Sequence, residues 1–164
     1  MWSDQEIGFW KEYLQAHHGL DGELERLDGE FDLNIAVRVD GHLDAVLKVM
    51  RVGCGSGLVG MQVEALDHLA VTMPDLPVPR VIRRHDGAAA AAVTDLSGDE
   101  RIAWVISAID GLPLGAMRPH PAALVHEIGR TLGRMTAGLE GFDHAALTRD
   151  FKWHPLQPHW AFPE

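Results

Sequence analysis

The sequence has little of several residue types, and each shortage excludes a class of protein. It has a single cysteine, Cys54, among 164 residues. An intramolecular disulfide is therefore impossible, and we expect the reducing environment of the cytoplasm. No apolar run approaches the roughly 18 residues that a bilayer span needs, and the acidic, amphipathic start of the chain lacks the pattern of a signal peptide. We therefore expect no membrane partner.

Positive charge is also scarce. The chain has 14 lysine and arginine residues against 24 aspartate and glutamate residues, and a net charge of -10. Such a charge opposes general binding to a phosphate backbone, so we expect no nucleic-acid partner. The 10 histidines suggest a metal, but there is no H-E-x-x-H, no C-x-x-C and no histidine pair with a carboxylate at metal-ligand spacing. We therefore predict no metal site.

The hydrophobic content of 46% allows a packed core, enough for one domain or for a large lobe of a bigger protein. Ser3 and Glu6 form a capping-box pattern, which predicts the start of a helix. Apolar residues follow this pattern at helical spacing, and the helix should end near Gly19.

A meander of strands should follow this helix. Residues 33–39 place apolar side chains on one face with a period of two, which is typical of a strand. The dipeptide Asp40-Gly41 is a strong signal for a tight turn, and residues 43–52 form the returning strand. With a shorter candidate at 23–27, we predict three antiparallel strands.

A glycine-rich turn separates this meander from the second half of the chain. There we expect two helices and up to three strands, one of them in an alanine-rich run that could also be helical. The helices are predicted at 58–71 and 120–139, and the strands at 79–84, 88–96 and 101–109. This order of elements indicates an α+β fold with an antiparallel sheet.

The glycine turn permits two interpretations. Gly55, Gly57 and Gly60 match G-x-G-x-x-G, as in a loop that binds a dinucleotide or S-adenosylmethionine (SAM). Such a loop needs a parallel sheet, whereas the Asp40-Gly41 hairpin makes the preceding strand antiparallel to its neighbour. We therefore favour a plain strand-to-helix turn and keep a SAM- or dinucleotide-binding fragment as an alternative.

Lys48 lies within the apolar strand "AVLKVM", where its ammonium group must reach water or find a partner. Glu64 follows in the next predicted helix. A lysine on a strand and a glutamate on the next helix can form an ion pair in which the lysine holds phosphate oxygens of ATP. The alternative is that Lys48 extends to water and that Glu64 is a solvated helix charge.

Five segments follow one another in an order that is found in a known family. They are "LDGEFDLNIAVRVDGHLDAVLKV", "QVEALDHLA", "LPVPRVI", "WVISAIDGLPL" and "LGRMTAGLEGFDHAALTRDFKW", and together they cover nearly the whole chain. In this order they resemble the N-terminal lobe and first C-lobe helix of aminoglycoside phosphotransferase-like kinases. The nearest branch is the hydroxylysine/homoserine kinase-like one, some members of which are fused to class III aminotransferases.

The resemblance implies an α+β, protein-kinase-like fold. An antiparallel five-stranded sheet with a packed helix would be preceded by an N-terminal helix and followed by a hinge and one long helix. The chain would divide into a kinase-like N-terminal lobe, residues 1–109, and a second part, residues 110–164. That second part would hold the hinge or linker and the first helical part of a truncated C-terminal lobe.

The resemblance also implies an ATP site. Lys48 would contact the phosphates, and Glu64 would anchor Lys48. The loop over the phosphates would be "DGEFDLN", whose three carboxylates, Asp28, Glu30 and Asp32, are unfavourable near phosphate without magnesium.

The adenine part of this site would lie between the sheet and the hinge. Val46 would line the adenine pocket, and Ile106 would guard its back. The resemblance assigns adenine recognition to main-chain groups, the Ser107 carbonyl oxygen and the Ile109 N–H.

The family's catalytic loop carries H-x-D with an asparagine five residues after the aspartate, which supply the base and a magnesium ligand. The one asparagine here, Asn34, has Gly29 five positions earlier, so the motif is absent. We therefore expect no catalytic residues, an inactive chain, and Mg²⁺ only with the missing C-terminal lobe. The parent protein would be an ATP-dependent kinase that phosphorylates a hydroxyl of an amino acid, amino alcohol or aminoglycoside.

Two further expectations concern partners. The alternative to a kinase lobe is a non-enzymatic, kinase-like docking module in which the lysine–glutamate pair is structural. The tail should pack on the missing lobe or mediate self-association through its aromatic residues, which are Phe151, Trp153, Trp160 and Phe162.

Overall fold

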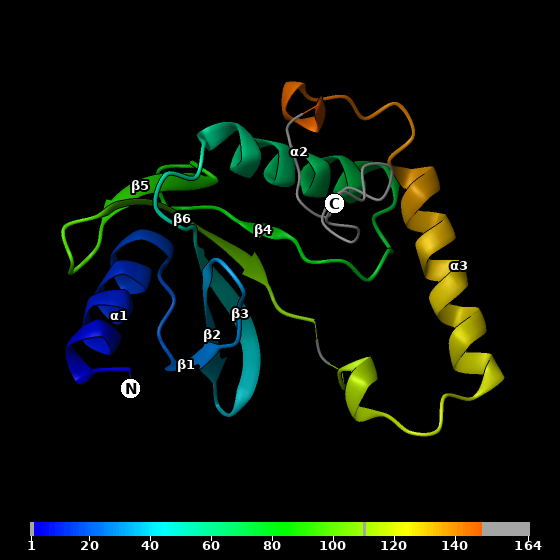
Figure 1. Ribbon diagram of the computed structural model, residues 1–164, viewed down its shortest axis with the longest axis horizontal. Helices are drawn as coiled ribbons and strands as arrows, with labels where there is room; N and C mark the ends of the chain where they lie inside the picture. The colour runs from blue at the N-terminus through cyan, green and yellow to red at the C-terminus, as the bar shows by residue number, and fades with distance from the viewer. Residues whose placement is uncertain (1, 110, 149–164) are drawn as a thin grey trace, which may run out of the picture.

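The computed structural model describes residues 2–109 and 111–148, and it has an α+β fold built on one antiparallel sheet (Figure 1). The strand order is β1-β2-β3-β6-β4, and β5 also pairs with β6. The strands are β1 (Glu23–Leu27), β2 (Leu33–Val39), β3 (His42–Val49), β4 (Val81–Ile82), β5 (Ala90–Thr94) and β6 (Glu100–Ser107). The helices are α1 (Asp4–His18), α2 (Ser56–Thr72) and α3 (Ala122–Gly138), with short 3-10 turns η1 (Leu114–Ala116) and η2 (Ala145–Thr148).

The N-terminal helix α1 begins and ends as its sequence predicts. The Ser3 side chain accepts a hydrogen bond from the Glu6 N–H at 3.2 Å, and Glu6 accepts one from the Ser3 N–H at 3.0 Å. These two bonds satisfy donors that the first helical turn leaves free. At the other end Gly19 adopts a left-handed conformation, φ 65°, which closes the helix.

The predicted meander of β1, β2 and β3 is confirmed. Asp40 and Gly41 have φ values of 51° and 80°, as a two-residue hairpin turn with positive φ at both positions requires. The register between β2 and β3 shifts once, between Val37 and Arg38. This bulge moves every later pair by one residue, which decides what faces Lys48.

Within the described residues the sheet has six strands rather than the predicted five. β6 pairs with β3 on one side and with both β4 and β5 on the other. β4 faces residues 105–106 of β6, and β5 faces residues 100–104, so the two short strands share one edge. A turn over 83–89 interrupts this edge, because Gly87 has a φ of 83° and donates its N–H back to the Arg84 carbonyl oxygen.

The two faces of the sheet have separate cores. α1 packs on one face, where ten buried residues meet: Trp10, Tyr13, Leu14, Ile35, Val37, Ala45, Leu47, Val49, Ala103 and Val105. α2 packs on the other face, around Met50, Val59, Val63 and Trp104. Alternate residues of β3 therefore serve opposite cores, which places Val46 and Lys48 on the α2 face.

The glycine turn before α2 has a structural explanation. The residue in the left-handed region is Gly53, φ 76°, rather than a glycine of the G-x-G-x-x-G match. A Cβ at Gly57 or Gly60 would lie 3.9 Å from Ala146 or 3.7 Å from His144, so both glycines face the segment that covers α2. Every recorded strand pairing is antiparallel, so the SAM- or dinucleotide-binding alternative lacks the parallel sheet that it requires.

The long helix α3 does not pack on the sheet. Its C-terminal end meets the C-terminal end of α2 (Figure 1). Gly138 lies against Leu69 and Met73, where a Cβ would come within 2.9 Å of both side chains. The Thr72 hydroxyl donates to the Gly138 carbonyl oxygen at 2.8 Å. Apolar residues on the rest of α3, such as Val125 and Leu132, are exposed.

Other sequence expectations meet the structure in part. Among the described residues no helix is long and apolar enough to cross a membrane. The division at residues 109/110 stays a prediction. The four tail aromatics, Phe151, Trp153, Trp160 and Phe162, lie outside the described residues.

Replacing Leu47 by alanine tests the central packing of β3. Leu47 is fully buried against α1, so the variant should lose about 2–5 kcal/mol of unfolding free energy through lost contacts and a residual cavity. Val71→Ala is the control, because Val71 is 82% exposed and should change stability by less than about 0.5 kcal/mol. Urea unfolding followed by circular dichroism measures both, and equal effects would contradict the packing described here.

Candidate functional site

Lys48 occupies the middle of the sheet face on which α2 packs. Its cross-strand neighbours are Asn34 on β2 and Trp104 on β6. Lys48 and Asn34 are half-buried, whereas Trp104 is buried and donates its indole N–H to the Met50 sulfur at 3.4 Å. Lys48 thus lies on the middle one of three adjacent strands. Its neighbour on β2, Asn34, is polar, and its neighbour on β6, Trp104, is largely apolar.

The partner of Lys48 is a neutral amide. Nζ donates a hydrogen bond to the Asn34 Oδ1 atom at 2.8 Å, and the Asn34 amide nitrogen donates to the Asp32 carbonyl oxygen at 3.4 Å. Burial lowers the pKa of Lys48 below its ordinary value, and the negative charge of Asp32 opposes this effect. The site therefore holds a cation that is partly stripped of water and to which no carboxylate of the described residues is bonded.

The predicted ion pair between Lys48 and Glu64 is wrong. In the described structure Glu64 makes its one recorded ion-pair contact, at 3.8 Å, with His144 after α3, and its side chain is 60% exposed. The cause is helical phase, because Val59 and Val63 face the sheet and Glu64 lies one residue further around the helix. Contact of Lys48 with phosphates stays a prediction.

The predicted adenine-lining residues do lie beside Lys48. Val46 and Ile106 face each other across β3 and β6, and Ala36 on β2 faces Val46 from the other side. Val46 and Lys48 are two residues apart on β3, so their Cα atoms are separated by about 7 Å along the strand. Val46 and Ile106 are half-buried, so the sheet presents a partly open apolar surface next to a cation.

The end of β6 is fixed before the chain enters the predicted hinge. Ser107 donates its N–H to the Arg80 carbonyl oxygen at 2.8 Å, and its hydroxyl accepts the Arg80 N–H at 2.9 Å. The Ala108 N–H donates to the Asp44 carbonyl oxygen at 2.9 Å. Ser107 is therefore held in place, whereas Ile109, two residues after β6, is 49% exposed.

The acidic loop between β1 and β2 is tied down next to Lys48. The Asp32 carboxylate accepts the Arg51 N–H at 2.9 Å, and the Arg51 guanidinium lies 3.9 Å from the same oxygen. Gly29 is required, because a Cβ there would lie 2.6 Å from the Asp32 carbonyl oxygen and 2.7 Å from the Asn34 amide nitrogen. The loop backbone therefore closes on the amide group that positions Lys48.

Sequence reasoning missed the role of Asn34, and the bulge explains why. Counting back from the turn, where Val39 faces His42, an unbroken hairpin pairs Lys48 with Leu33. The bulge changes the partner to Asn34. The alternation of residues in these strands does not indicate a bulge. The single polar residue in the first half of β2, Asn34, was the one hint that this position has a special partner.

A metal centre is not evident in the described part of the chain. No three histidine, cysteine, aspartate or glutamate side chains of residues 2–109 and 111–148 gather where they could hold a metal ion.

Comparison with known proteins shows the fold. The chain matches no protein-family model and no curated protein. Among solved structures it is similar to an amicoumacin kinase in complex with AMP-PNP and Ca²⁺, with a TM-score of 0.65 and 15% identity over 87% of this chain. It is also similar to a microcompartment-associated aminopropanol kinase, with a TM-score of 0.60 and 19% identity over 93% of this chain.

These similarities confirm the kinase-like fold that the resemblance implied. The chain covers 42% of the amicoumacin kinase and 46% of the aminopropanol kinase, so it spans less than half the length of either neighbour. At these identities the likeness is one of fold alone, and the activities of the two neighbours are not assigned to this chain on that basis.

Asn34→Asp tests the environment of Lys48. A carboxylate in place of the amide should raise the pKa of Lys48, because a bonded negative charge favours the ammonium form. The chain has three lysines, so ¹³C-labelled lysine gives a spectrum simple enough to titrate, and Lys48→Arg assigns the signal. Asn34→Ala should act in the opposite direction, since it removes an acceptor from the charged form. Equal pKa values in all three proteins would contradict the observed contact.

Proposed function

We propose that this chain is the ATP-binding lobe of a small-molecule kinase that phosphorylates a hydroxyl group. The observation that carries the proposal is the placement of Lys48: a half-buried ammonium group, bonded to a neutral amide, in the centre of a kinase-like sheet. The residues present fit a nucleotide, because the cation stands beside the apolar surface of Val46 and Ile106.

The charge of Lys48 supports phosphate binding. Its hydrogen-bond acceptor, Asn34, is a neutral amide, so this partner does not neutralise the charge of the ammonium group. Its lowered pKa reflects a cost of burial that a phosphate group would offset. Glu64, which contacts His144, has no part in this proposal.

Adenine would lie over Val46, with Ile106 behind it, and would be read by the Ser107 carbonyl oxygen and the Ile109 N–H. The double contact of Ser107 with Arg80 supports this assignment, because it fixes the strand end from which the hinge departs. An apolar wall beside one main-chain acceptor and one main-chain donor suits a flat, neutral base.

Phosphoryl transfer needs groups that this sequence does not contain. It requires a base for the acceptor hydroxyl and ligands for magnesium, and there is no H-x-D-x-x-x-x-N here. We therefore assign these groups, and the pocket for an amino alcohol, amino acid or aminoglycoside acceptor, to a C-terminal lobe. The exposed apolar residues of α3, Val125 and Leu132 among them, are a suitable surface for that lobe.

A kinase-like docking module is the second candidate function. It is favoured by the acidic loop, because the carboxylates of Asp28, Glu30 and Asp32 oppose a nearby triphosphate. Arg51 offsets part of this charge through its contact with Asp32. Nucleotide binding distinguishes the two functions.

Lys48→Ala in the intact chain tests the proposal. Wild-type chain should bind ATP in isothermal titration calorimetry, and the variant should bind at least about tenfold more weakly, since it loses a charge-assisted contact with phosphate. Lys11→Ala is the control, because Lys11 is exposed on α1, which packs on the opposite face. It should bind ATP as the wild type does.

Two outcomes would count against the kinase assignment. ATP binding that is equal in wild type and Lys48→Ala would remove Lys48 from the site. No binding of ATP, with or without Mg²⁺, would favour the docking module.

A further inference from the structure

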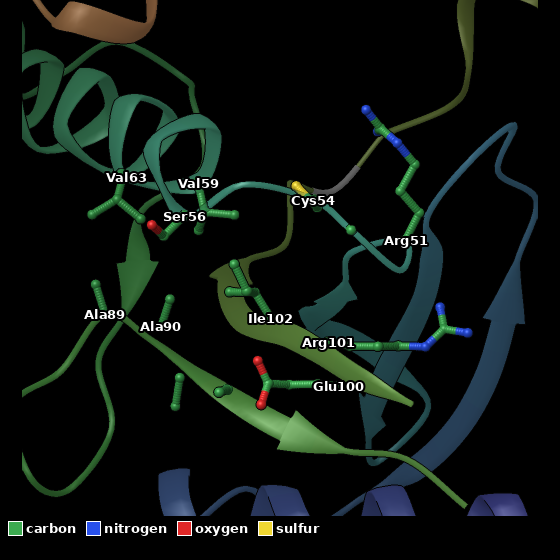
Figure 2. A pocket seen from close by; sticks show the side chains of 14 residues that line it. Arg51, Cys54, Ser56, Val59, Val63, Ala89, Ala90, Glu100, Arg101 and Ile102 are labelled. Atoms are coloured by element: carbon green, nitrogen blue, oxygen red, sulfur yellow. The ribbon is translucent and has the colours of Figure 1, made fainter. Parts of the chain in front are cut away.

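A cavity that Lys48 does not line lies between the first turns of α2 and the hairpin of β5 and β6 (Figure 2). Its volume is about 530 Å³, within the range of pockets that hold small organic molecules. Val59 and Val63 of α2 form one wall, and Ile102 of β6 lies opposite. The proposed nucleotide surface uses none of these side chains.

Small residues keep this cavity open. Ala90 and Ala92 of β5 face Trp104 and Ile102 of β6, so they lie on the α2 side of the sheet. Strands usually carry β-branched or aromatic residues at such positions, and these would fill the space beneath α2. The alanine run therefore has a structural consequence that its composition alone did not reveal.

One charged group reaches into the cavity from the strand. Glu100 faces Thr94 across the hairpin, and Figure 2 shows its side chain extending to the same side of β6 as Ile102, where both line the pocket. No hydrogen bond or ion pair of the Glu100 side chain is recorded among the described residues. The carboxylate is thus an available acceptor at the edge of an apolar space.

The two arginines that border the cavity are engaged elsewhere. Arg101 bonds the Asp95 carboxylate at 2.6 Å, and in Figure 2 its side chain extends away from Glu100. The Arg51 guanidinium lies 3.9 Å from the Asp32 carboxylate and 5.6 Å from the centre of the Phe31 ring. The charge available inside the cavity is therefore negative, which disfavours anionic ligands and nucleotides.

We propose that this cavity binds a small organic amine, with an apolar body between α2 and Ala90–Ala92 and its ammonium group on the Glu100 carboxylate. The apolar walls supply affinity through burial, and the carboxylate supplies selectivity for a cation over a neutral or anionic analogue of the same shape. The net charge of -10 adds a general attraction for cations. This inference is independent of ATP binding at Lys48.

The test compares two probes of the same shape, 2-phenylethylamine and 2-phenylethanol, by ¹H–¹⁵N spectra of the full chain. The amine should shift the amide signals of Ala90, Ala92 and Ile102 in a saturable way. Glu100→Gln should weaken the amine about threefold to fivefold, as expected for a partly solvated ion pair, and leave the alcohol unchanged. Glu12→Gln, an exposed glutamate on α1, is the matched control and should change neither probe.

A cavity-filling variant, Ala92→Leu, should abolish the shifts from both probes. Ala92 is exposed at the pocket, and the remainder of the spectrum reports whether the variant is folded. The proposal is overturned if the amine shifts no signal of the pocket, if both probes bind equally well, or if Glu100→Gln binds the amine as the wild type does. Since Glu100 is exposed, its variant should fold, so the charge test stands even if Ala92→Leu does not fold.

Discussion

The hydrogen bond between the Lys48 ammonium group and the Asn34 amide oxygen is the contact on which the candidate site depends. Without it, a lysine in an apolar strand would extend to water, and the position of its ammonium group would not indicate a binding site. With it, the cation is held over the face of the sheet that also carries Val46 and Ile106. Because the acceptor is neutral, the positive charge remains available for an anionic ligand.

Several constraints converge on this bond. The bulge in the β2–β3 hairpin brings Asn34 opposite Lys48, and Gly29 allows the acidic loop to close on the same amide. The pairing of β3 with β6 sets Trp104 against the lysine, and burial there explains the direction of its pKa shift. A kinase-like fold thus places a cation centrally without the glutamate of α2, whose helical phase directs it to His144.

Much of the fold could be predicted from local signals. The capping box at Ser3, the turn at Asp40-Gly41 and the period of residues 33–39 each act within a few residues, so they can be read from sequence. Long-range register could not be read. The bulge, the division of one sheet edge between β4 and β5, and the phase of α2 relative to the sheet all depend on tertiary packing. The same limit explains why Lys48 could be selected as a site residue while its partner was misassigned.

The most direct measurement follows the ¹³Cε signal of Lys48 in the intact chain during titration with ATP. We predict a saturable shift of this signal and a higher pKa for Lys48 in the bound state, because phosphate favours the ammonium form. The signals of the other two lysines should stay in place. A saturable ATP complex in which the Lys48 signal and pKa are unchanged would contradict the proposed contact between Lys48 and phosphate.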